Sequence, residues 1–155
     1  MGQFAGVGGA IYLTAVAMLT LVITYTDLRW YWVPDVGVLC LAAVQAVALG
    51  MHLVEPDLAV SAGVSLFFIL IYVFSRGGMG SGDVKLGIVL SIGCTGIGAY
   101  GMVLFAFASA LVIAVPRRFV RGSGYVPFAP FLLAGWWVSL VFYKEWVRCV
   151  LPVSL

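Results

Sequence analysis

Long apolar runs separated by short polar connections are the feature that most limits how this 155-residue chain can fold. The sequence is 64% hydrophobic and only 9% charged, whereas a soluble domain is usually about 25% charged and at most about half apolar. The apolar excess is too large for an ordinary buried core. We therefore predict an all-α, polytopic membrane helix bundle that forms one membrane-embedded domain over residues 1–155.

The apolar runs have the length of membrane-spanning helices. A helix needs about 20 mostly apolar residues to cross a bilayer, and we count about six such stretches. They cover residues 6–26, 33–53, 58–74, 84–100, 101–115 and 127–143. An uncharged, glycine-rich turn between Gly93 and Gly101 joins the fourth stretch to the fifth. One long kinked helix is therefore an open alternative at that place.

Basic residues divide unequally between the two sides of the predicted bundle. With the N-terminus outside, the cytoplasmic loops carry six of them: Arg29, Arg76, Lys85, Arg117, Arg118 and Arg121. The opposite side keeps only Lys144 and Arg148. Because cytoplasmic loops of membrane proteins are enriched in Lys and Arg, this bias predicts a multi-pass protein with its N-terminus outside.

Two aspartates stand at the edges of these runs. Asp27 ends the first run, and Asp83 begins the fourth, directly after the glycine-rich stretch 77–82. A carboxylate at membrane depth costs about 2.5–3.5 kcal/mol, so such a residue is by default a functional hypothesis. Two predicted crossings separate the aspartates, which places both at the same face. Two carboxylates that meet can share one proton and so provide both an acid and a base, as in aspartic proteases.

Each of these features also has a purely structural interpretation. Asp27 alone could be a hydrated residue at the interface, and Asp83 could cap a helix after a flexible loop. Asp35, directly after Pro34, suits the first turn of the second helix, where its charge favours the helix dipole. The two prolines within residues 124–131 are most simply explained as residues that shape the start of a helix.

The glycine-rich stretch 77–82 allows a second interpretation. Glycines permit positive φ and let another backbone approach closely. Such a loop can hold a peptide beside Asp83 without obstruction by side chains. No Gly-Lys-Ser/Thr follows, so the stretch does not fit a phosphate-binding loop.

Several other kinds of site find no support in the sequence. The cysteines Cys40, Cys94 and Cys149 are scattered and form no pair with metal-ligand spacing, so we expect neither a disulfide framework nor a zinc site. His52, the only histidine, lies on the predicted face opposite the aspartates. The net charge is only +2, and no basic stripe could follow a nucleic acid. We predict no metal, no cofactor and no nucleic-acid partner.

The order of these segments resembles that of the type IV prepilin peptidases, which are polytopic aspartic peptidases of the GxGD class. The segments that carry the resemblance are Asp27 with residues 33–35, residues 78–86 and residues 127–132. The resemblance implies that Asp27 and Asp83 are the catalytic pair. It also implies that Gly80 and Gly82 are the motif glycines of a substrate-binding loop, in which we include Lys85.

The resemblance further implies a substrate and a location. The substrate would be a prepilin or pseudopilin with a short basic leader, a glycine before the scissile bond and an apolar helix after it. The enzyme would lie in a bacterial or archaeal inner membrane, in contact with lipid, with its active site at the cytoplasmic face. Longer members of the family carry a cysteine-tetrad zinc segment and methylate the new N-terminus. Because the cysteines here form no tetrad, we predict cleavage without methyl transfer.

Two other classes of function are open alternatives. In an ion- or proton-coupled transporter, the two acids would form a relay. That function needs polar groups along a path through the spans, and those present, such as Thr14, Gln45 and Ser109, are scattered and uncharged. A membrane scaffold of a secretion machine would not need paired acids at all. The sequence leaves the oligomeric state open.

Overall fold

The computed structural model describes residues 6–75, 78–121 and 126–150. Within these residues the chain forms six helices and no strand, which confirms the predicted all-α fold. The helices are α1 (Val7–Trp30), α2 (Asp35–Gly50), α3 (Leu58–Phe74), α4 (Ser81–Ile92), α5 (Gly98–Arg121) and α6 (Ala129–Val150). Of the basic residues that predict the orientation, Arg76 lies outside the described residues, as do the side chains of Arg117, Arg118, Arg121, Lys144 and Arg148.

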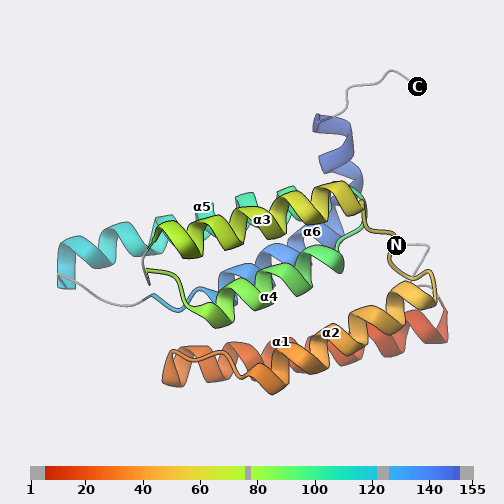
Figure 1. The fold of residues 1–155 in the computed structure, drawn as a ribbon, viewed down its shortest axis with the longest axis horizontal. Coiled ribbons are helices and arrows are strands. Elements are labelled where there is room, and N and C mark those ends of the chain that lie inside the picture. Colours follow the sequence, from red (N-terminus) through yellow and green to blue (C-terminus); the bar gives the residue numbers. More distant parts are fainter. Residues whose placement is uncertain (1–5, 76–77, 122–125, 151–155) are drawn as a thin grey trace.

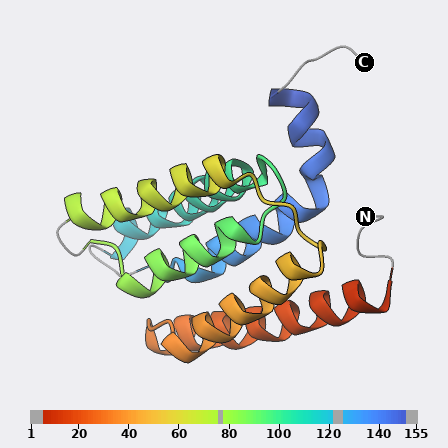
Figure 2. The ribbon, with the colours of Figure 1, turned by 45° about the vertical axis from the view of Figure 1, so that its right-hand side comes forward.

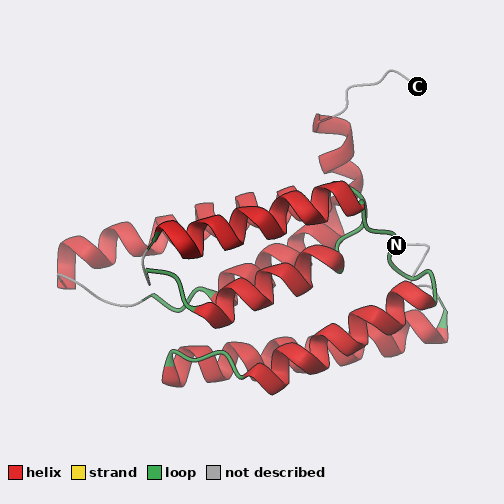
Figure 3. Ribbon diagram, viewed as in Figure 1, coloured by secondary structure: helices red, strands yellow, loops and turns green. Residues whose placement is uncertain are grey.

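The helices contact one another in a closed ring. α1 packs on α2 and α6, α3 packs on α4 and α5, and contacts of α2 with α4 and of α5 with α6 complete the ring. Figures 1 and 2 show α1 and α2 side by side, set apart from the group formed by α3, α4, α5 and α6. The short α4 also contacts α5 and α6, so it lies at the centre of the fold. The connections drawn in Figure 3 are short and lie at the ends of the helices.

Helix lengths agree only in part with the expectation of about six spans. Two helical segments are both long and apolar enough to cross a membrane, Val7–Trp30 and Gly98–Pro116. Three shorter apolar segments accompany them, Asp35–Gly50, Leu58–Phe74 and Ala129–Phe142. The number of helices in the described residues is therefore as predicted, whereas α2, α3 and α4, with 16, 17 and 12 residues, are shorter than the usual length of about 20 residues for a full crossing.

The fourth and fifth predicted spans are two separate helices, with a boundary different from the one expected. α4 has 12 residues, a length of about 18 Å at 1.5 Å per residue. After Ile92 the chain turns, and Gly96 adopts a positive φ of 49°. The Gly96 N–H donates to the Glu55 carbonyl at 3.0 Å, so the connection between α2 and α3 holds this turn. These contacts rule out one long kinked helix.

The first helix is longer than predicted. α1 continues to Trp30, and Tyr31, with a φ of 53°, ends it by donating its N–H to the Asp27 carbonyl at 2.9 Å. Asp27 therefore lies in the last turn of α1 and not at the end of the helix. The C-terminal end of α1 and the N-terminal end of α4 lie at the same end of the bundle (Figure 1). This confirms that the chain returns Asp83 to the end at which Asp27 lies.

Buried polar contacts fix the other end of α4. The Trp136 indole N–H of α6 donates to the Gly93 carbonyl at 3.1 Å, and the Ser61 hydroxyl of α3 donates to the Ser91 carbonyl at 3.0 Å. The Gln45 side chain of α2 packs so closely on Gly93 that a β-carbon there would overlap it. Three helices thus hold the C-terminal end of α4, and this sets the position of Asp83 at its other end.

Candidate active site

Asp27 is buried where α1 meets the start of α6. Its side chain is 4% exposed, and its Oδ2 accepts a hydrogen bond from the Ala129 N–H at 3.1 Å. Ala129 is the first residue of α6. The hydrated interfacial residue that we considered for Asp27 is therefore wrong, because protein surrounds this carboxylate.

Asp83 is half-buried in the first turn of α4. Gly80 is the N-cap of the helix and Asp83 is its third residue, so the alternative that Asp83 is the N-cap is wrong. Asp83 Oδ1 is shielded from solvent, and no group among the described residues donates a hydrogen bond to it. A buried polar atom without a partner carries a large desolvation penalty. Such penalties persist mainly where function requires them.

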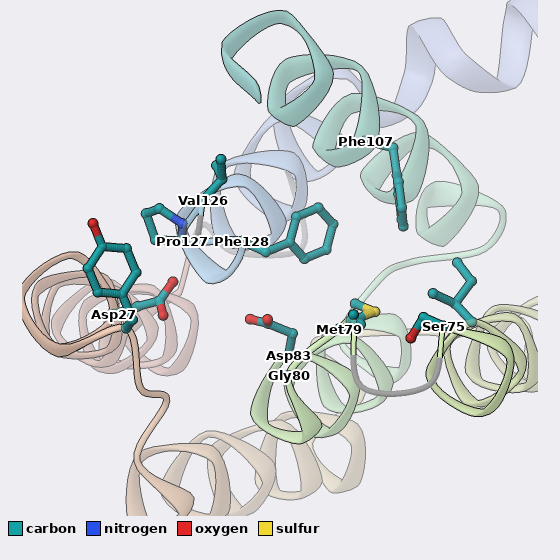
Figure 4. Close-up of a pocket in the computed structure, with 12 residues that line it drawn as sticks. Asp27, Ser75, Met79, Gly80, Asp83, Phe107, Val126, Pro127 and Phe128 are labelled. Carbon is teal, nitrogen blue, oxygen red and sulfur yellow. The ribbon is translucent and has the colours of Figure 1, made fainter. Parts of the chain in front are cut away.

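Both aspartates line a cavity of about 540 Å³ at this end of the bundle. Figure 4 shows their carboxylates pointing toward each other from opposite sides of it. They are near enough for the charge of Asp27 to act on Asp83. Apolar side chains from three other segments complete the wall: Ile71 of α3, Met79 before α4, Phe107 of α5, and Val126, Pro127 and Phe128 before α6. The cavity thus combines a carboxylate pair with an apolar surface.

A second, smaller cavity of about 170 Å³ adjoins the same pair. Its lining includes both aspartates, the predicted motif glycines and the start of α2: Asp27, Tyr31, Trp32, Val33, Asp35, Gly80, Ser81, Gly82 and Asp83. Four of the five predicted site residues therefore come together here, although 52 residues separate Asp27 of α1 from Gly80 at the start of α4.

Lys85 is the predicted site residue that lines neither cavity. Its Nζ forms an ion pair with Asp35 Oδ1 at 2.7 Å, and the two side chains are 54% and 70% exposed. Asp35 lies in the first turn of α2, as predicted, and Pro34 is the N-cap of that helix. The ion pair joins the first turns of α2 and α4 beside the smaller cavity.

The two motif glycines matter because they have no side chain, and not because their backbone adopts a conformation that favours glycine. Gly80 has a φ of −66°, and the only described glycine with a positive φ is Gly96. A β-carbon at Gly80 would lie 3.2 Å from Asp83 Oδ2, and one at Gly82 would lie 2.8 Å from the Val33 β-carbon. Of the two properties that the sequence suggested, a positive φ applies to neither glycine, and close approach by another segment applies to Gly82, where Val33 lies.

The sequence did not identify the contact between Asp27 and the start of α6. Ala129 lies 102 residues after Asp27. The donor is a backbone N–H, so the type of residue 129 does not indicate that it binds a carboxylate. The only available signal was the pair of prolines around it, Pro127 and Pro130, which we interpreted as a helix start. The structure confirms the helix start and adds that it faces the aspartate.

Comparison with known protein families now decides what kind of protein this is. The model of the type IV leader peptidase family matches residues 14–116, which is more than half of the chain. The chain belongs to this family. No match is found among curated proteins or among solved structures. The family identifies a protease, and together with the apolar helices it indicates a membrane protein. The matched region contains both aspartates and both motif glycines.

In this peptidase, we expect Gly82→Ala to lower kcat by up to about 10²-fold, the loss that about 1 Å of misplacement can cause. The new β-carbon must displace either Val33 or the start of α4, and Asp83 is the next residue. The measurement is the cleavage rate of a protein substrate by the purified variant. Adding Val33→Gly, which removes the clashing atom, should restore part of the rate. Full activity of Gly82→Ala alone would contradict the prediction.

Proposed function

We propose that the chain is an aspartic endopeptidase that removes the short basic leader of type IV prepilins or pseudopilins, after a glycine, at the cytoplasmic face of the membrane. Asp27 and Asp83 are its catalytic pair. The observation that carries the proposal is that these two carboxylates line the same cavities and point toward each other. The membership of the chain in the type IV leader peptidase family supports the choice of substrate.

The chemistry needs one proton on the pair. The ionised carboxylate removes a proton from a water molecule, and the resulting hydroxide attacks the scissile carbonyl carbon. The protonated carboxyl polarises the carbonyl oxygen and then supplies the proton that the leaving amine requires. At the end of the cycle the pair again holds one proton. Two carboxylates this near titrate as a coupled pair, because the charge of each acts on the other.

The surroundings of the pair suit a substrate that is partly apolar. In the larger cavity, Phe107 and Phe128 offer an apolar wall beside the carboxylates. Glycines line the smaller one, so a peptide backbone can approach closely there. We propose that the leader stays on the cytoplasmic side while the apolar helix of the substrate lies in the bilayer beside the bundle. This assigns the end of the bundle with the aspartates to the cytoplasmic side, with the N-terminus outside.

Co-expression with a prepilin tests this function. We expect a shorter product in a gel, and N-terminal sequencing should place the cut directly after a glycine. We also propose that the new N-terminus is not methylated, so the intact mass of the product should show no added methyl group. A transporter or a scaffold would leave the prepilin uncut, and that result would overturn the proposed function.

We further propose that Lys85 contacts the substrate at the rim of the smaller cavity. Lys85→Gln and Asp35→Asn remove the same ion pair, which is exposed and therefore contributes only about 0.2–1 kcal/mol to stability. Each variant should retain nearly the same stability as the parent protein. If Lys85 contacts substrate, Lys85→Gln should raise KM several-fold and Asp35→Asn should raise it less. Equal KM values in the two variants would show that Lys85 only holds Asp35.

A further inference from the structure

The two carboxylates of the pair have different hydrogen-bond environments. Asp27 Oδ2 accepts the Ala129 N–H at the start of α6, whereas Asp83 Oδ1 receives no hydrogen bond from the described residues. We propose that this N–H holds the negative charge of the pair on Asp27 and leaves the shared proton on Asp83, which makes Asp27 the base and Asp83 the acid. This assignment rests on the proposed peptidase function and extends it to the role of each residue.

The start of α6 is built so that one N–H remains for Asp27. Pro130 has no N–H, and the Phe131 and Leu132 N–H groups both donate to the Phe128 carbonyl, at 3.0 and 3.2 Å. The Ala129 N–H is therefore the donor of this first turn that points to the carboxylate. Hydrogen bonds to a carboxylate favour its ionised form. The positive end of the helix dipole adds to that preference.

Among the described residues, the lining of the two cavities contains few other titratable groups that could change this balance. The titratable residues that line the two cavities with Asp27 are Asp83 of α4, Asp35 at the start of α2 and Tyr31 at the end of α1. Asp35 is paired with Lys85 at the surface. The lining residues from α3, from α5 and from the segment before α6 are not ionisable. The Ala129 contact is therefore the difference that favours charge on Asp27, and it acts against the greater burial of that residue.

The assignment fixes the direction of proton transfer. Asp27 removes the proton from water as the new carbon–oxygen bond forms. Asp83 donates a hydrogen bond to the carbonyl oxygen and then gives its proton to the leaving amine as the carbon–nitrogen bond breaks. Asp27 then passes the proton taken from water to Asp83, so the pair again holds one proton. The buried Asp83 Oδ1, to which no described residue donates a hydrogen bond, fits this role because a neutral carboxyl group is far less costly to bury than a charged one.

Labelling with an epoxide tests the assignment without peptide cleavage. The probe is phenyl glycidyl ether, added at neutral pH to the full chain in lipid bilayers. An ionised carboxylate oxygen attacks an epoxide carbon and forms an ester, the ring carbon–oxygen bond breaks, and the ring oxygen takes a proton from the neighbouring acid. Peptide mass spectrometry then locates the ester. We expect Asp27 to be labelled about tenfold or more over Asp83, as a charge-assisted hydrogen bond implies.

A backbone change provides the matched variant. Replacing the peptide bond between Phe128 and Ala129 by an ester removes the Ala129 N–H and keeps every side chain. The control replaces the bond between Pro130 and Phe131, which removes the Phe131 N–H that donates to Phe128. We expect the first ester to lower the labelling preference for Asp27 and to reduce kcat with little change in KM. The control should retain the preference of the parent protein.

Two results would overturn the proposal. One is equal labelling of the two aspartates, or preferential labelling of Asp83, in the parent chain. The other is an equal loss of preference in both ester variants, which would mean that Ala129 acts only on the helix start. Neither result would contradict the peptidase function, which requires only that the pair holds one proton. Conversely, failure to cut a prepilin would leave the labelling result unaffected.

Discussion

Asp27→Asn and Asp83→Asn, made separately, should each lower kcat/KM for prepilin cleavage by about 10²–10⁴-fold, the contribution of a positioned acid or base. Asn keeps the size of the side chain but can neither take nor give the proton of the pair. Because the two residues act as one unit, the double variant should lose little more than either single variant. The measurement is the initial rate of cleavage with purified enzyme and substrate in bilayers.

Asp57→Asn is the matched control for these variants. Asp57 caps α3, where its Oδ1 accepts the N–H groups of Ala59 and Val60 at 2.9 and 3.2 Å. Asn is about as good an N-cap as Asp, so this change alters an aspartate outside the two cavities and should leave both activity and stability nearly unchanged. Full activity in Asp27→Asn or in Asp83→Asn would refute the catalytic pair.

Gly135→Ala should have the largest effect on stability among glycine-to-alanine changes in the described helices. A β-carbon at Gly135 of α6 would lie 2.5 Å from the backbone carbonyl oxygen of Met102 in α5. A backbone atom cannot rotate away as a side chain can, so the two helices must separate. We expect the free energy of unfolding to fall by about 1–3 kcal/mol, as in other overpacked sites.

Unfolding by a denaturing detergent in mixed micelles measures this change. Gly50→Ala serves as the control, because a β-carbon at Gly50 meets no atom within 4 Å. That variant should be as stable as the parent or slightly more stable, since Ala favours a helix more than Gly does. Equal stability of Gly135→Ala and Gly50→Ala would show that α5 and α6 can separate without loss.

The apolar runs predicted the helices better than they predicted the ends of the helices. Residues 58–74 were predicted without error, because the charged and proline residues before Leu58 and the polar residues after Phe74 mark both ends. The end of α1 was placed too early at Asp27, because a charged side chain usually marks the end of an apolar run. A partner from another helix allows that carboxylate to be buried, and a single run does not reveal such a partner.

The same difference separates the residues of the site. Asp83 and the glycines before it form a local motif, so residue type and spacing were enough to identify them. The contact between Asp27 and Ala129 joins residues far apart in the chain through a backbone N–H, which every residue except proline has. Sequence patterns therefore carried no information about it.

The sequence by itself determined that the chain is helical, that Asp27 and Asp83 return to one end of the bundle, and that glycines lie beside Asp83. These properties follow from composition, from the number of crossings and from local spacing, and each of these can be obtained from the order of residues without knowing how the helices pack. The tertiary structure alone decided that α1 and α4 face each other across a cavity and that the start of α6 binds Asp27. Those facts depend on how the helices pack, which is a balance of contacts between distant segments.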